Sequence, residues 1–436
     1  MLKKSILFII ISTIILIIIG TTTFVYIYWP RTVNILGLEI PIKVKILNLT
    51  GCPINDTSEW KNDLNKFKNL KMVICKDQAI TEEEKNELEE KFPNVFFDIV
   101  TTINVFGIRV REDEKEIDFS SAENVDETII KKLEQFPNLE KVNLLNHNLR
   151  QEDQMELLKK YPHISFEWNV EIASKSVENN ITKLDLTKAT IDDLEKFTNA
   201  LKMLPNLEYM DMSECNLSNE ELANLREQFP NIKIVWTIHL GKWKLKTDAV
   251  AFSVLITQFD YVRMKSEDIE VLKYCTDLQA LDLGHQAITD ISVIGDHLPD
   301  LRILILADNK ISDISPLSKL KHLHYLELFI NRISDLTPLI ECKELVDLNL
   351  CYNTTVNFNT LIENDFPMLE RLWIVGCRIS SKNYKLLKEK YPNATIMNSG
   401  SGSTNGGWRT HDRYYAMINM FYKRNYISEL FSKYDT

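Results

Sequence analysis

The chain has 436 residues, of which 44% are hydrophobic and 26% are charged, and this is the composition of a folded globular protein. Its 12 glycines and 13 prolines are too few for a long disordered or low-complexity region. The formal net charge of −11 at pH 7 argues against nucleic-acid binding, because phosphate groups require a basic surface.

The chain begins with an apolar segment that is long enough to cross a membrane. Residues 5–29 carry no charge, and at about 1.5 Å per helical residue they exceed the roughly 30 Å of hydrocarbon in a bilayer. Lys3 and Lys4 precede the segment, and the interfacial residue Trp29 ends it. This pattern predicts a cytoplasmic N-terminus at 1–4, a single transmembrane signal anchor at 5–29, and an extracytoplasmic body attached to the cell membrane.

A cleaved signal peptide is the alternative, and it would make the protein secreted. The apolar run is longer than the hydrophobic region of most signal peptides, and the first alanine of the chain is Ala79, so no A-x-A cleavage site occurs near the segment. The small residues from Gly20 to Thr23 keep cleavage open as an alternative. A lipoprotein is disfavoured because the first cysteine is Cys52.

Residues 30–260 repeat with a long and irregular period. An aromatic residue followed by proline recurs at Phe92, Tyr161 and Phe229, at intervals of 69 and 68 residues. Each marker follows a run that is typical of a helix, and the three runs span 82–91, 151–160 and 219–228. The β-rich stretches after the markers are too long for one repeat strand, so we expect an additional strand or hairpin in each unit.

Residues 261–397 repeat with a short and regular period. The repeats begin at leucines separated by 23, 22, 22 and 24 residues. These leucines are Leu278, Leu301, Leu323, Leu345 and Leu369. The repeats follow L-x-x-L-x-L/I-x-x-N/C/Q, and the alternating leucines predict a short strand with one face in the core. Ser315-Pro316 and Thr337-Pro338 resemble a helix N-cap followed by proline, which predicts a helical or 3-10 turn on the return path.

The Gly/Ser-rich linker followed by Gly-Trp-Arg-Thr-His at 407–411 resembles the ending of secreted leucine-rich-repeat proteins of low-GC Gram-positive bacteria. The repeats themselves resemble leucine-rich repeats, and specifically the bacterial internalin-like type. The segments Ile-Ser-Asp-Ile-Ser-Pro-Leu at 311–317 and Ile-Ser-Asp-Leu-Thr-Pro-Leu at 333–339 carry the resemblance. It implies an α/β leucine-rich-repeat solenoid with a concave parallel β-sheet and a helical or 3-10 convex side, which here follows the transmembrane helix.

The ninth position of each repeat has a structural role. Asn309, Asn331 and Asn353 occupy it, and an inward amide there can satisfy backbone groups from one repeat to the next. Cys52 and Cys377 fall at the same position. We therefore interpret the cysteines as buried structural thiols, with no disulfide framework, metal site or cofactor.

The side chains at the third, fifth and seventh positions of the repeats should line the concave sheet and form a partner-binding surface. We call nine of them the concave-face residues. They are Ile303, Ile305, Tyr325, Glu327, Phe329, Asp347, Asn349, Arg371 and Trp373. Large apolar groups beside carboxylates predict a protein or peptide ligand, and the carboxylates favour a basic one. Two alternatives stay open: an ordinary surface, or a face covered by the C-terminal segment.

Residues 398–436 comprise a Gly/Ser-rich linker and a capping tail, in which 414–433 has the spacing of an amphipathic helix. The whole pattern predicts a membrane-anchored, extracytoplasmic protein-binding or adhesion module without enzymatic activity. A self-associating envelope scaffold is the alternative function. A less favoured one is an enzyme that works through His411, around which no nucleophile arrangement or catalytic motif is visible.

Overall fold

The computed structural model describes residues 31–52, 58–254 and 263–423, and the predicted anchor at 5–29 lies outside them. Within this described part of the chain, no helix is both long and apolar enough to cross a membrane. The backbone divides into two compact units. The first comprises residues up to Asn180 together with Glu195–Pro205, and the second comprises Ile181–Leu194 and the residues from Asn206 onward.

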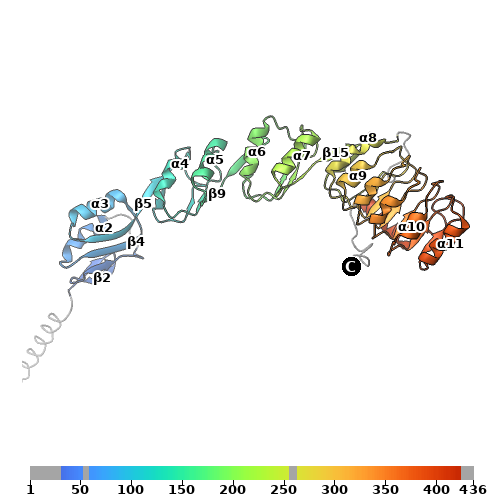
Figure 1. Cartoon of the computed structure of the whole chain (residues 1–436). Helices are drawn as coiled ribbons and strands as arrows, with labels where there is room; N and C mark the ends of the chain where they lie inside the picture. The colour runs from blue at the N-terminus through green and yellow to red at the C-terminus, as the bar shows by residue number, and fades with distance from the viewer. Residues whose placement is uncertain (1–30, 53–57, 255–262, 424–436) are drawn as a thin grey trace, which may run out of the picture. The chain divides into compact units, whose positions relative to one another are not determined.

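The first unit contains small sheets, and helices connect the parallel strands of the larger ones (Figure 1). Its first part contains β1 (Thr32–Ile35), β2 (Leu38–Pro41), β3 (Ile46–Asn48), α2 (Ser58–Lys61), η1 (Asp63–Lys66), β4 (Met72–Thr81), α3 (Glu82–Lys91), β5 (Phe96–Val105) and β6 (Ile108–Arg111). Strands β3, β4 and β5 are parallel, and β6 folds back antiparallel to β5.

The same plan returns later in the first unit. The elements are β7 (Glu116–Asp118), α4 (Ile129–Lys132), η2 (Leu133–Gln135), β8 (Lys141–Asn143), α5 (Gln151–Lys160), β9 (Ser165–Glu167), β10 (Asn169–Ile172), β11 (Lys175–Glu178) and α6 (Leu194–Lys202). Strands β7, β8 and β9 form a parallel sheet, and β10 and β11 form a hairpin after it.

The second unit begins with the third copy of this plan and continues with the regular repeats. The third copy contains β12 (Lys183–Asp185), β13 (Tyr209–Asp211), α7 (Asn219–Gln228), β14 (Lys233–Val235), β15 (Thr237–Leu240) and β16 (Trp243–Lys246). An antiparallel pair therefore follows each short parallel sheet, at the places where the sequence predicts additional strands.

The aromatic-proline markers are helix ends. Helices α3, α5 and α7 begin and end at the residues that the sequence predicts. Phe92, Tyr161 and Phe229 each donate a backbone N–H to the carbonyl four residues earlier. The proline that follows has no N–H with which to continue the helix, so the chain turns into the next strand.

The regular repeats form a seven-stranded parallel sheet. Its strands are β17 (Ala251–Ser253), β18 (Ala280–Asp282), β19 (Ile303–Ile305), β20 (Tyr325–Glu327), β21 (Asp347–Asn349), β22 (Arg371–Trp373) and β23 (Thr395–Met397). The return paths contain α8 (Ser266–Ile269), η3 (Glu270–Tyr274), α9 (Ser292–His297), η4 (Ser315–Lys319), η5 (Thr337–Glu341), α10 (Asn359–Glu363) and α11 (Ser381–Lys390). The expected leucine-rich-repeat solenoid is confirmed by this arrangement.

The predicted N-caps of the 3-10 turns are wrong in detail. Ser315 and Thr337 are the first residues of η4 and η5, and neither side chain caps the turn. Instead, the carboxylates of Asp313 and Asp335 accept the backbone N–H groups of Ser315 and Thr337, both at 2.8 Å. Each aspartate side chain accepts the N–H group of the residue two positions later, which is the geometry of an Asx turn.

The asparagine ladder is present as predicted. Asn331 Nδ2 donates to the carbonyls of Leu306 and Leu328, and its Oδ1 accepts the N–H of Ile311. Cys377 takes the corresponding place in its repeat, where its thiol donates to the carbonyl of Leu350 at 3.1 Å. None of the seven cysteines forms a disulfide in the described residues, and six of them are buried.

Candidate functional site

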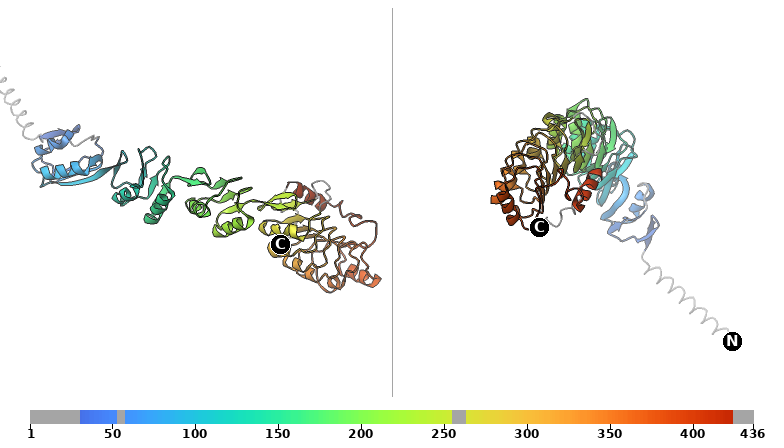
Figure 2. Two further views of the ribbon diagram at one scale, coloured as in Figure 1. Left: turned by 90° about the horizontal axis from the view of Figure 1, so that it is seen from above. Right: turned by 90° about the vertical axis from the view of Figure 1, so that its right-hand side faces the viewer.

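The concave sheet of the regular repeats is covered by the C-terminal segment of the same chain, here residues 398–423. Beyond β23, a linker leads into α12 (Asp412–Lys423). Helix α12 packs against β17, the first strand of the sheet, although it follows the last strand in the chain. Figure 2 shows this dark red helix beside the yellow part of the sheet. The C-terminal segment therefore runs back across the concave face.

Helix α12 contacts the sheet through one apolar stripe. Met417, Met420 and Phe421 are buried in the same cluster as the concave-face residues. With Arg413 they occupy positions i, i+4, i+7 and i+8, which lie on one side of a helix. Tyr415 on the opposite side is 59% exposed. The helix is thus amphipathic, and its apolar side packs against the concave face of the solenoid.

Trp408 is the aromatic anchor of the C-terminal segment. Its side chain is fully buried, and its indole N–H donates to Glu327 Oε1 at 2.6 Å. The indole lies against Tyr325 and Trp373, with ring centroids 5.4 and 5.1 Å apart. The guanidinium of Arg371 lies over the same indole, 4.5 Å from the ring centroid. Aromatic and cation–π contacts of this kind give buried anchors both area and orientation.

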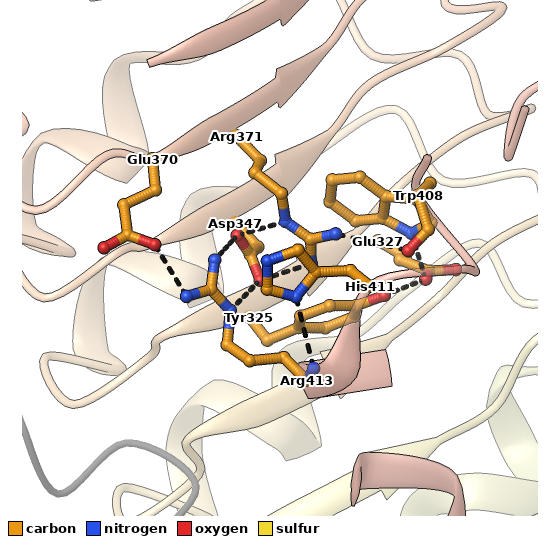
Figure 3. A network of polar contacts seen from close by, with 8 residues as sticks. All are labelled: Tyr325, Glu327, Asp347, Glu370, Arg371, Trp408, His411 and Arg413. Atoms are coloured by element: carbon orange, nitrogen blue, oxygen red, sulfur yellow. Dashed lines mark hydrogen bonds and ion pairs between the residues drawn. The ribbon is translucent and has the colours of Figure 1, made fainter. Parts of the chain in front are cut away.

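A buried carboxylate holds the C-terminal segment at a second point. Asp347 accepts two hydrogen bonds from Arg371, at 2.8 and 2.6 Å, and two from Arg413, at 2.8 and 3.0 Å. Arg413 also donates to Glu370 at 2.6 Å. Figure 3 shows Asp347 between the two guanidinium groups. Two arginines balance the two carboxylates, so the network is electrically neutral while it is closed.

The linker residues also bind to the solenoid. The indole N–H of Trp373 donates to the carbonyl of Asn405 at 2.8 Å, and the side-chain amide of Asn349 donates to the carbonyl of Ser403 at 2.8 Å. The C-terminal segment therefore satisfies polar groups of the concave face before its helix begins.

Burial shifts the ionisation of several groups in this network. It raises the pKa of Glu327, and the hydrogen bonds from Trp408 and Tyr325 offset part of that rise. It also raises the pKa of Asp282, a neighbour on the same face, to about 6. Burial, followed by the charges of Arg371 and Arg413, lowers the pKa of His411. The imidazole of His411 is therefore neutral at pH 7.

All nine concave-face residues come together on one sheet, but they do not face water. Each is buried, and Phe329 is only 2% exposed. The expected solvent exposure is therefore wrong, because the C-terminal segment covers the face, which is one of the two alternatives that the sequence leaves open. Sequence reasoning missed the partners Trp408, Arg413 and Glu370. The available signal was Trp408 directly after a Gly/Ser-rich linker, with Arg413 five residues later.

An exposed rim borders the covered face. His285, Asp308, Ile330 and Tyr352 follow consecutive strands at the same repeat position, and all have left-handed backbone with φ between 51° and 60°. Ile330 is 41% exposed and Tyr352 is 38% exposed. His285 and Asp308 form an ion pair at 2.9 Å when the imidazole is protonated. We call these four side chains the rim residues.

The described ranges hold no group of three or more His, Cys, Asp or Glu side chains that could bind a metal ion. The ring of His411 accepts the backbone N–H of Arg413 at 3.2 Å. The imidazole thus helps to turn the backbone into α12.

A family model described as leucine-rich repeats, in two copies, matches residues 299–341. The chain carries leucine-rich repeats. Proteins built from such repeats generally serve as protein-binding scaffolds. No curated protein sequence matches the chain.

Among solved structures, the chain is similar to the internalin inlF of Listeria monocytogenes, with 17% identity and a TM-score of 0.30, over 77% of this chain and 75% of that one. Internalin C2 of the same organism is 19% identical, with a TM-score of 0.28, over 52% of this chain and 86% of that one. A leucine-rich-repeat protein of Leptospira interrogans is 17% identical, with a TM-score of 0.27, over 81% and 89%.

Proposed function

We propose that this protein is a membrane-anchored, extracytoplasmic module that binds another protein or a peptide, and that the concave-face residues are its binding surface. The observation that carries the proposal is that this face already holds a polypeptide. The buried indole of Trp408 donates a hydrogen bond to Glu327, and Arg413 donates to Asp347. Buried Trp and Arg side chains are the residues that most often dominate protein interfaces.

The charges of the face favour a basic ligand. Without the C-terminal segment, Asp347 stays paired with Arg371, and Glu327, Glu370 and Asp282 add negative charge. A ligand that brings an arginine or lysine restores the positive charge that Arg413 presents to Asp347 and Glu370 in the closed chain.

The anchor at 5–29 and the outside location are supported by the charge-free apolar run and by the lysines before it. Protease added to intact cells that express the full chain tests the location. We expect the body to be degraded and a short membrane-embedded fragment to remain. Release of the intact body into the medium would instead support a cleaved signal peptide, and protection until lysis would overturn the outside location.

Site-specific photocrosslinking tests the binding surface. A photoreactive amino acid at Ile330 or Tyr352 reports on the rim of the concave face. The matched control positions, Met155 and Leu158, are 37% exposed on α5 of the first unit. We expect a protein partner to be crosslinked from the two rim positions and not from α5. Crosslinks from α5 alone would move the site away from the regular repeats.

A further inference from the structure

We infer that the C-terminal segment is an exchangeable internal ligand of the concave face, and that the partner displaces it with a segment that presents an aromatic side chain and, a few residues later, an arginine. This inference rests on the proposed function, because it assumes that the concave face is the binding surface. It adds the chemistry of the ligand and the reason why the face is closed when no ligand is present.

The solenoid is complete without the C-terminal segment. Every strand pair of the regular repeats joins strands between Ala251 and Met397, so the described residues beyond Met397 add no strand to the sheet. The asparagine ladder and the leucine core also lie within the repeats. Residues 403–421 therefore contact a surface that already exists, as a ligand does.

The carboxylates of the network keep partners when the segment leaves. Asp347 retains both hydrogen bonds from Arg371, and Glu327 retains the hydrogen bond from the hydroxyl of Tyr325. Glu370 has a side chain that is 40% exposed, so water can replace Arg413 there. Opening therefore leaves no buried charge on the solenoid without a partner. Such an unpaired charge is the usual free-energy cost of opening a buried ion pair.

The connection to the solenoid permits exchange. The linker contains Gly400, Gly402, Gly406 and Gly407, all with positive φ. A side chain added at Gly400 or Gly407 would meet no atom within 4 Å. Because the linker is short, it holds the segment at an effective concentration of the order of millimolar, so an external ligand competes at a disadvantage. Weakening the internal contacts should therefore increase the apparent affinity of an external ligand.

The first experiment uses a fluorescein-labelled peptide with the sequence of residues 403–423 as the probe, and measures its anisotropy with the full chain in lipid nanodiscs. The test variant is Trp408→Ala/Arg413→Ala, and Tyr415→Ala on the exposed side of α12 is the matched control. We expect the double variant to bind the peptide roughly tenfold or more tightly than the parent. The control should equal the parent, and a peptide that carries the same two alanines should not bind.

A second experiment avoids the risk that the double variant unfolds. A protease site inserted after Gly400 allows the parent chain to fold with its segment docked and to be cleaved afterwards. Exchange of the cleaved segment for labelled peptide supports the inference. A cleaved segment that stays bound in an excess of peptide overturns it, and so does a folded double variant that binds no peptide.

The outcomes separate this inference from the proposed function. Peptide exchange without any partner crosslinked at the rim would support the exchangeable segment and contradict the proposed function. Rim crosslinks without peptide exchange would support the proposed function and contradict the exchangeable segment. A concentration-dependent dimer of the parent that the peptide dissociates would make a second copy the displacing ligand, and it would overturn the assignment to a different protein.

Discussion

Replacing Arg413 with alanine removes two hydrogen bonds to Asp347 and one to Glu370. Bonds to charged groups contribute about 1.5–3 kcal/mol each when both partners are buried and neither is paired again. Here Asp347 keeps Arg371, and Glu370 is partly exposed, so we expect the docking of the C-terminal segment to weaken by only about 2 kcal/mol. This corresponds to roughly a thirtyfold increase in the opening equilibrium.

Replacing Asp347 with alanine should cost more, because it leaves two buried guanidinium groups without their shared carboxylate. Removal of one member of a buried ion pair costs about 3–5 kcal/mol. The opening equilibrium should then rise more than about a hundredfold. The order of the two variants follows from the geometry, since Asp347 binds two buried arginines, whereas loss of Arg413 leaves Asp347 paired with Arg371 and Glu370 open to water.

Hydrogen–deuterium exchange with mass spectrometry measures this opening locally. The amides of α12 should exchange faster in Arg413→Ala and fastest in Asp347→Ala, while those of β20 remain protected. Arg111→Ala is the matched control, because Arg111 binds Asp113 through two bonds of 2.9 and 2.8 Å at a partly exposed site. Surface pairs contribute about 1 kcal/mol or less. Equal exchange of α12 in the parent and Arg413→Ala, or a smaller effect of Asp347→Ala, would refute the reasoning.

Four further predictions concern stability and reactivity. Burial raises the pKa of Asp282 to about 6, so the parent chain loses stability as the pH rises from 3.8 through 6. Asp282→Asn should therefore stabilise the chain by up to about 3 kcal/mol at pH 7.5 and leave its stability unchanged near pH 3.5. Urea unfolding at the two pH values measures both effects. Ile330→Asn should stabilise by about 1 kcal/mol in thermal melts, because a β-branched residue with φ of 56° is strained. Asn331→Ala should destabilise by about 2 kcal/mol in the same melts, because it leaves the buried N–H of Ile311 without its acceptor and removes one of the two amide donors to each of the Leu306 and Leu328 carbonyls. Cys342 and Cys351 should resist iodoacetamide at pH 8 in the folded chain, since burial raises the pKa of each thiol to about 12.

Each of these predictions has its own control. A parent chain whose stability is the same at pH 3.5 and 7.5 would remove the basis of the Asp282 prediction. Ile330→Val keeps the β-branch, so it should not stabilise as Ile330→Asn does. Arg332→Ala, at the exposed residue next to Asn331, should change the melting temperature little. Rapid alkylation of the two thiols under native conditions would show that the solenoid opens there.

The sequence by itself determined the repeat architecture. The leucines of each strand and the ninth-position asparagine contact only their own repeat and its neighbours, so a period read along the chain describes them fully. The helices α3, α5 and α7 were predictable to the residue, because an aromatic-proline pair ends each one. The 3-10 turns were also predictable, but their caps were not, because the aspartate that accepts the first N–H of each turn lies two residues before it, outside the Ser/Thr-Pro pair.

Only the tertiary structure decided what covers the concave face. Trp408 and Glu327 are 81 residues apart, and Arg413 and Asp347 are 66 residues apart. No periodicity links them, because the C-terminal segment belongs to no repeat. Whether a row of large side chains faces water or another segment depends on where a non-repeating chain end comes to rest. Here the indole of Trp408 and the guanidinium of Arg413 bind to the surface that the repeats form, and these contacts place the chain end on the concave face.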